Sequence, residues 1–235
     1  YSGGTPLTTY SISTNYYRES TVFPGDFKDQ RFSASSSVGS RTRDNKLHFF
    51  FSSSYNLELN RLLNQDLSSA LLLPPNAPPV YDVYGKLNWT ENGVHYSNPM
   101  AATLRTYASD IDRFTGNTWT SYQLLSKLLL KVSAGLNRVT ITEKGLTPIA
   151  SQNPAFNPKG TANFANNALQ SWIAEIQAEY SERLGNDVQL KALFGSSWQH
   201  SRTEGKAVSG TGYVSDIQLN SINGAASISN TDNYS

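Results

Sequence analysis

Apolar and polar residues alternate along much of the chain, and this period of two predicts strands with one apolar and one polar face. In the first stretch, Tyr10, Ile12 and Tyr16 alternate with polar residues such as Ser11 and Asn15. Seven stretches show the pattern, at about residues 9–16, 31–38, 46–59, 113–124, 128–137, 168–184 and 188–203. The sequence therefore predicts an all-β fold with about seven strands.

One of these stretches, residues 168–184, has two interpretations. Five apolar residues recur there at helical spacing, and Gly185 is a suitable helix end; they are Leu169, Ile173, Ile176, Tyr180 and Leu184. Taken alone, the segment favours a helix. We predict a strand because the neighbouring segments alternate and an antiparallel sheet requires a partner at this position.

The connections between the predicted strands alternate in length. Short turns are expected near residues 41–46, 125–127 and 185–187, and longer connections near 19–27, 60–106, 145–167 and after 204. This asymmetry is typical of transmembrane β-barrels, which have short periplasmic turns and long extracellular loops. We therefore expect residues 60–106 and 145–167 to be long extracellular loops.

Alternation alone fits two architectures, a membrane barrel with lipid against its apolar face and a soluble sandwich with that face as its core. If the strands run from one predicted connection to the next, they are about 13–17 residues long, more than the ~9–11 residues that are needed to cross a bilayer. Small polar residues are abundant, with 31 Ser, 19 Thr and 21 Asn, and 16% of residues are charged. Several aromatic residues of the apolar face lie near strand ends, as in the girdles of barrels. These features favour a segment of a transmembrane antiparallel β-barrel in contact with outer-membrane lipid. A secreted soluble β-sandwich lectin or adhesin is the alternative.

The sequence contains no recognisable catalytic or metal-binding motif. The absence of Cys excludes disulfides, zinc–thiolate centres and a cysteine nucleophile, and a net charge of +1 gives no support for nucleic-acid binding. Glu175 and Glu179 would lie about 13 Å apart on a strand, too far for a glycosidase pair. We expect neither an enzyme nor a cofactor, and a soluble β-rich hydrolase is a third, weaker hypothesis.

The aromatic residues of the long loop are the candidate binding residues. Aromatic rings stack on sugars, and neighbouring Asn or Asp can bind hydroxyl groups or peptide amides. The candidates are Tyr81, Tyr84, Trp89 and Tyr96. The alternative is that these rings pack the loop against the rim of the barrel.

Several phrases in order resemble the SusC/RagA-like TonB-dependent transporters, outer-membrane proteins of Bacteroidetes-type bacteria. The most specific lies within Leu71–Gly85, where Pro74-Pro75-Asn76-Ala77-Pro78-Pro79 precedes Tyr81 and, later, Asn98-Pro99. Other stretches resemble the family's barrel hairpins and the connection that follows them; they are Gly3–Ser33, Arg113–Gly135, Ser171–Gly195 and Gly210–Asp216. The resemblance covers nearly the whole chain.

This resemblance implies a 22-stranded barrel with an internal plug, of which residues 1–235 would be a partial barrel domain lacking the plug. It implies active import of an oligomeric nutrient, an oligosaccharide or a peptide, across the outer membrane. The partners it implies are a SusD-like surface lipoprotein, TonB through a segment absent from this chain, and the remainder of the protein's own barrel and plug. We therefore expect this chain to be a piece of a longer protein.

Overall fold

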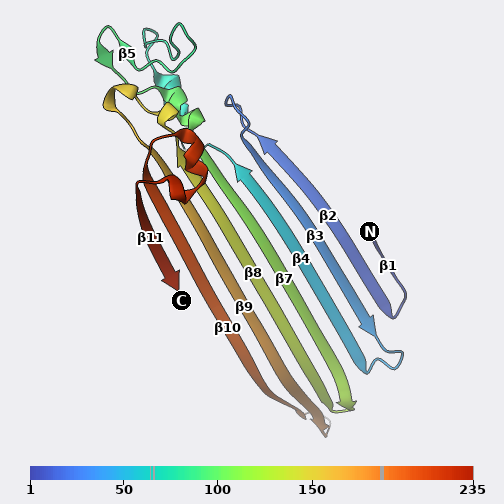
Figure 1. The fold of residues 1–235 in the computed structure, drawn as a ribbon. Helices are drawn as coiled ribbons and strands as arrows, with labels where there is room; N and C mark the ends of the chain where they lie inside the picture. Colours follow the sequence, from blue (N-terminus) through green and yellow to red (C-terminus); the bar gives the residue numbers. More distant parts are fainter. Residues whose placement is uncertain (64, 66, 186–187, 235) are drawn as a thin grey trace.

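A computed structural model describes residues 1–63, 65, 67–185 and 188–234, and it shows one large antiparallel sheet (Figure 1). Strands that follow one another in the sheet also follow one another in the chain, so the sheet is a meander. Its strands are β1 (Ser2–Gly4), β2 (Thr8–Ser20), β3 (Lys28–Arg41), β4 (Leu47–Arg61), β7 (Thr106–Leu125), β8 (Leu128–Thr147), β9 (Gly160–Leu184), β10 (Val188–Tyr213) and β11 (Ser227–Tyr234).

The seven predicted strands correspond to β2, β3, β4, β7, β8, β9 and β10, so the all-β prediction is confirmed. The strand interpretation of residues 168–184 is also confirmed, and the helical alternative is wrong. Trp172 of β9 pairs with Leu136 of β8 on one side and His200 of β10 on the other. Ladders on both sides satisfy the backbone of β9, and this outweighs its helical spacing of apolar residues.

The prediction fails at the end of the chain. Residues after 204 were expected to form a long connection, with Gly210–Asp216 as a loop, but β10 continues to Tyr213 and β11 follows. Gly205, Gly210 and Gly212 interrupt the alternation, so the sequence pattern fades although the pairing persists. Gly210, for example, pairs with Ala162 of β9 and Ile228 of β11.

The long connections gather at one end of the sheet, which we call the loop end, and the short turns lie at the other, the turn end (Figure 1). The long connections cover residues 21–27, 62–105, 148–159 and 214–226, and short turns cover 42–46 and 126–127. The turn predicted at 185–187 begins with Gly185, whose positive φ of 73° suits a turn glycine. Residues 186 and 187 lie outside the described part of the chain.

Short elements shape the long connections. Residues 62–105 contain the 3₁₀ helices η1 (Ser68–Leu72) and η2 (Pro99–Leu104) and a small hairpin of β5 (Thr90–Glu91) and β6 (Val94–His95). The others are η3 (Ile149–Ser151), η4 (Pro154–Phe156), η5 (Asp216–Asn220) and η6 (Ile222–Gly224). The helices of the described residues have at most six residues, and none of them is long and apolar enough to span a membrane.

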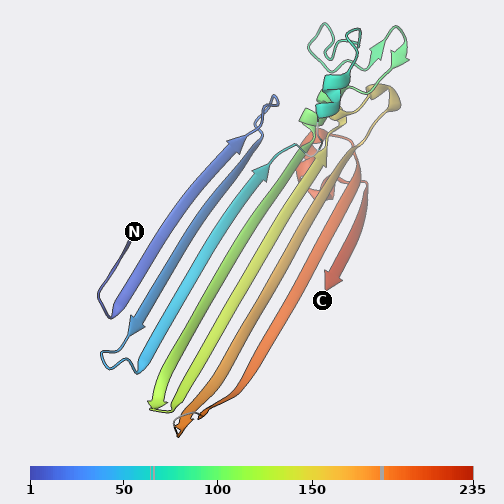
Figure 2. The same cartoon turned by 180° about the vertical axis from the view of Figure 1, so that it is seen from behind.

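The sheet is a single layer when viewed from either side (Figures 1 and 2). The two packed sheets that a β-sandwich needs are not found in the described residues. A small apolar cluster of Ala162, Tyr213 and Leu219 is fully buried at the loop end. Most large apolar side chains along the strands are exposed instead, including Phe32, Trp172 and Trp198.

Candidate functional site

The strand register gathers the apolar side chains into one band on one face of the sheet. On β8 the band covers nine residues, Leu128–Leu136, which pair with Tyr180–Trp172 of β9. This length matches the ~9–11 residues with which a tilted strand crosses a bilayer. Aromatic residues mark both borders of the band; Tyr10, Tyr122 and Tyr180 lie toward the turn end, and Tyr16, Phe32, Tyr55, Phe114, Trp172 and Trp198 lie toward the loop end.

The borders of this apolar band run obliquely across the strands. Along the cross-strand pairs, Phe32 of β3 is level with Thr140 of β8, whereas Trp198 of β10 is level with Ala134. The loop-side border therefore shifts by six residues over five strand spacings. Six residues along a strand correspond to about 20 Å, and five strand spacings correspond to about 24 Å. The border is therefore inclined by about 40° to the direction perpendicular to the strands.

The opposite border has the same slope. Tyr10 of β2 is level with Ala134 of β8, and Tyr180 of β9 is level with Leu128, again six residues over five strand spacings. Two parallel borders define a slab that the strands cross at about 40° from its normal, and strands of membrane barrels tilt by about 35–45°. The sheet therefore has the geometry of a barrel wall that crosses a bilayer.

The opposite face, which we call the polar face, is lined mainly by neutral hydroxyl and amide side chains. A hollow of about 540 Å³ lies around Gly135, lined mainly by Thr115, Asn117, Asn137, Ser171, Gln199 and Ser201. Nearer the turn end, Lys131 donates to Glu179 at 2.5 Å, and Ser133 donates to Glu175 at 2.9 Å. Both carboxylates of the pair considered from sequence are thus engaged with β8.

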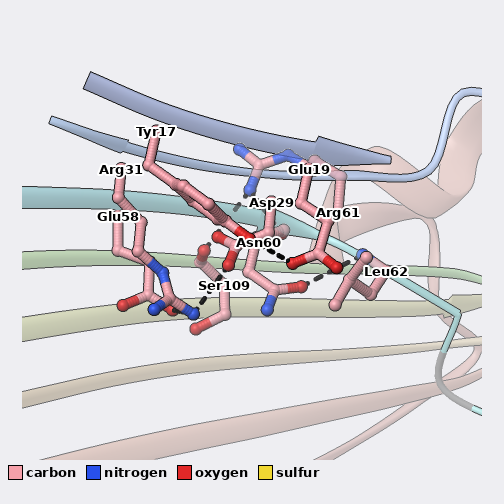
Figure 3. Close-up of polar contacts among 9 residues, drawn as sticks. All are labelled: Tyr17, Glu19, Asp29, Arg31, Glu58, Asn60, Arg61, Leu62 and Ser109. Atoms are coloured by element: carbon pink, nitrogen blue, oxygen red, sulfur yellow. Dashed lines mark hydrogen bonds and ion pairs between the residues drawn. The ribbon is translucent and has the colours of Figure 1, made fainter. Parts of the chain in front are cut away.

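Charged residues of the polar face gather at the loop end of β2, β3 and β4 (Figure 3). Two successive rows form the cluster, one of Tyr17, Arg31 and Glu58 and the other of Glu19, Asp29 and Asn60. The guanidinium of Arg31 lies 2.7 Å from Asp29 and 3.7 Å from Glu58, and 5.9 Å from the centre of the Tyr17 ring. The Asp29 carboxylate raises the pKa of Arg31, so this cation stays charged.

Asp29 is the buried member of this cluster. Its side chain is 5% exposed, and one carboxylate oxygen accepts from Arg31. The other oxygen, Oδ1, makes no hydrogen bond to any described residue. Through its contacts with Glu58 and Tyr17, Arg31 of this network joins the loop ends of β2, β3 and β4 on the polar face.

The four aromatic candidates from the sequence all lie in the 62–105 connection, but no ring contact joins any two of these described residues. Tyr81 forms an isolated bridge with Leu87, and its side chain is exposed. Tyr84 sits at a tight turn, where its backbone N–H donates to Asp82, and it is 85% exposed. These two rings are the ones open to a ligand.

Trp89 and Tyr96 contribute to the loop's own packing. Trp89 lines a hollow of about 350 Å³ between η1 and η2. The Tyr96 hydroxyl donates to the Pro79 carbonyl at 2.8 Å, and the Tyr96 amide donates to the Trp89 carbonyl. The alternative of loop packing thus describes these two rings better than it describes Tyr81 and Tyr84.

Asn98 organises this connection, although the sequence pattern did not single it out as a site residue. Its side chain donates to the carbonyls of Val80 and Asn88 at 2.6 and 2.9 Å and accepts from the Met100 amide at 2.9 Å. The residue is 4% exposed. An Asn before a Pro at the start of a helical turn is the available sequence signal, because Asn caps such turns.

Three of the long connections touch one another at the loop end. The His95 ring packs on Phe156 with their centres 5.5 Å apart, and this contact joins the 62–105 and 148–159 connections. The Asp216 carboxylate accepts from the amides of Ile149 and Ala150 at 2.6 and 3.2 Å, and this contact joins 148–159 to 214–226. The result is one continuous loop surface above the sheet.

In the part of the chain that the structure describes, no three His, Cys, Asp or Glu side chains lie close enough together to bind a metal ion. The arrangement offers an apolar band, a hydroxyl- and amide-rich opposite face, and a surface of joined loops.

Comparison with known proteins gives a fold but no family assignment. No protein-family model matches the chain. A curated protein, glycogen synthase of Granulibacter bethesdensis, is 28% identical over 143 residues, which cover 60% of this chain and 28% of that protein. This partial similarity is too distant to assign a family.

Solved structures cover almost the whole chain. The RagAB peptide importer in its closed-closed state matches with a TM-score of 0.74 and 20% identity, over 99% of this chain and 28% of the matched chain. The RagAB peptide transporter matches at 0.73 and 18%, and the open-open importer at 0.71 and 19%. The chain therefore shares the fold of a segment of this importer and spans about 28% of its matched chain.

Proposed function

We propose that this chain forms part of the wall and rim of an outer-membrane transporter that imports an oligopeptide or an oligosaccharide. The observation that carries the proposal is the oblique apolar band. Its two aromatic borders are inclined to the strands by the angle expected when tilted barrel strands cross a bilayer. The fold shared with the RagAB importer supports it independently.

The two faces have different roles in this proposal. The apolar face contacts lipid, and the polar face lines the lumen, where its hydroxyl and amide groups solvate a hydrated solute or a plug. Tyr81 and Tyr84 are proposed to contact substrate from the loop surface, while Trp89 and Tyr96 keep the 62–105 connection in shape. The chain itself contributes no covalent chemistry.

The proposed partners follow from the resemblance to SusC/RagA-like transporters. A SusD-like surface lipoprotein would cover the loop end, and TonB would drive import through a plug belonging to the rest of the protein. The remaining strands of a 22-stranded barrel would pair with the edges of this sheet and so satisfy their backbone groups in lipid.

Cell fractionation tests the proposal directly. Outer membranes of the source cells are run on SDS gels with and without boiling, and the intact mass of the band carrying these peptides is measured. A band several times heavier than 25.9 kDa that shifts on heating is expected of a closed barrel. A soluble species near 25.9 kDa without a heat shift would reject the transporter and favour a secreted lectin-like protein.

Uptake measurements then test the substrate. A strain lacking the whole gene is offered labelled oligopeptides and labelled oligosaccharides of matched size, and uptake is compared with that of the complemented strain. Loss of uptake of one class and its recovery on complementation identifies the substrate. Unchanged uptake of both classes would contradict nutrient import.

A further inference from the structure

A row of polar side chains stands on the apolar face just beyond the loop-side border of the band. Arg138 of β8 pairs with Gln170 of β9, and Gln170 pairs with Arg202 of β10. All three side chains are exposed. Toward the turn end, the next residue on the same face is Leu136 on β8 and Trp172 on β9. The row therefore lies where the apolar band gives way to polar surroundings.

Only one of the two arginines in this row has an ion-pair partner among the described residues. Among the described residues, Arg138 makes no ion pair or hydrogen bond. Arg202 forms an ion pair with Glu204, which lies two residues farther along the same strand. Asp112 of β7, diagonal to Arg138 on the same face, accepts the hydroxyl hydrogen of Tyr55 and keeps its own negative charge. Arg138 therefore presents a guanidinium without an ion-pair partner beside an apolar surface.

The spacing suits a small anion. Arg138 and Arg202 are separated by one strand, so their Cα atoms lie about 10 Å apart. Long arginine side chains at that distance can converge on one group, with the Gln170 amide between them as a further donor. Guanidinium groups bind phosphate oxygens in a bidentate manner and are the preferred cations at such sites.

We propose that the Arg138–Gln170–Arg202 row binds the phosphate group of an outer-leaflet lipid headgroup. A phosphorylated lipid is favoured over free phosphate because its acyl chains can lie against Leu136 and Trp172 while its phosphate reaches the arginines. The inference rests on the proposed function in one respect, that the apolar band lies in the outer membrane.

The test uses the full-length protein, purified from outer membranes and placed in phosphatidylcholine nanodiscs containing a small fraction of bis-phosphorylated lipid A. Native mass spectrometry measures how many lipid A molecules remain bound. The parent is compared with Arg138→Gln/Arg202→Gln and with Arg113→Gln. Arg113 is the matched control because it is exposed on the opposite face, between Asn56 and Val139.

We expect the parent and Arg113→Gln to retain lipid A equally, and the double variant to bind about 25-fold more weakly, about fivefold for each arginine. Equal retention by the double variant would overturn the site. A heat-shifted gel mobility like that of the parent shows that the variant barrel is folded.

Two further arms use only the parent protein, so they stand even if the variant does not fold. Dephosphorylated lipid A with the same acyl chains is expected to bind no better than phosphatidylcholine. Inorganic phosphate at the same concentration is expected not to displace lipid A, and displacement would identify a free-phosphate site instead. Absence of the protein from the outer membrane would be seen earlier, in the fractionation, and would reject the proposed function rather than this row alone.

Discussion

The Asp216 carboxylate accepts a hydrogen bond from the backbone amide of Ile149, 67 residues away in the chain. A second bond, from Ala150, completes a clasp between the 148–159 and 214–226 connections. Because hydrogen bonds to a charged acceptor contribute more than neutral ones, this contact is a main tie in the loop surface.

Replacing Asp216 should therefore loosen this surface without unfolding the sheet. In Asp216→Ala we expect local protection of the Ile149 and Ala150 amides to fall by about 1.5–3 kcal/mol, measured by hydrogen exchange. Ser215→Ala is the control, because the Ser215 side chain does not cap η5. Unchanged exchange in Asp216→Ala would show that the two connections are held by other contacts.

Asn98 is expected to be equally important within the 62–105 connection. Asn98→Ala removes two donated bonds and one accepted bond and leaves the carbonyls of Val80 and Asn88 without this partner. Each buried group left unsatisfied costs about 1–3 kcal/mol, so limited proteolysis of the loop should become at least tenfold faster. The exposed Asn76→Ala should be cleaved like the parent. Equal cleavage of both variants would refute the role given to Asn98.

Gly210 has no room for a side chain. A Cβ atom there would lie 2.5 Å from the Tyr213 hydroxyl, 2.8 Å from Ile222 and 2.9 Å from Ala225. Overpacking of this kind typically costs about 1–3 kcal/mol, so Gly210→Ala should lower the temperature at which the heat shift occurs on gels. Gly145→Ala is the control, since its nearest neighbour, Tyr107, would be 4.0 Å away. If Gly210→Ala shifted on gels at the same temperature as the parent, the 214–226 connection would have to lie farther from β10 than the structure shows.

The turn end contains a carboxylate whose titration should follow its partners. Lys127 and, secondarily, the Tyr180 hydroxyl donate to Glu182 and lower its pKa below the ordinary value of 4.5. Because the folded pKa is depressed, its stabilising contribution is complete above the unfolded pKa and is lost as pH falls through the folded pKa. Lys127→Gln should raise the Glu182 pKa, as measured by NMR titration of labelled glutamate. Glu182 titrating at 4.5 or above in the parent would argue against this contact.

The exposed loop rings give a prediction for binding. If Tyr84 contacts substrate, Tyr84→Ala should weaken uptake affinity by roughly tenfold, which is about 1.4 kcal/mol and more than the ~1 kcal/mol that most interface residues cost when truncated. Stability should not change, since the ring is 85% exposed. Tyr96→Phe should instead lower the stability of the loop and leave uptake affinity unchanged, because it removes the hydrogen bond to the Pro79 carbonyl. Uptake by Tyr84→Ala equal to that of the parent would remove Tyr84 from the binding surface.

Local sequence determined the strands and their two faces. Side chains alternate across a strand whatever its partner is, so Tyr10, Ile12 and Tyr16 fix one face of β2 before any pairing is known. The seven long strands could be predicted for this reason. The helical spacing in residues 168–184 favours a helix only for the isolated segment. In the sheet, ladders on both sides of β9 determine its extended backbone conformation.

Only the tertiary structure decided how the strands align with one another. Register is a property of pairs, so the level of Phe32 relative to Trp198, and with it the slope of the apolar band, cannot be read along one strand. The same holds for the Arg138–Gln170–Arg202 row and the clasp from Asp216 to Ile149, which join residues far apart in sequence. The chain's own pattern specifies which side chains lie on the apolar face and which lie on the polar face, and cross-strand pairing specifies where the borders of the apolar band and the loop contacts lie.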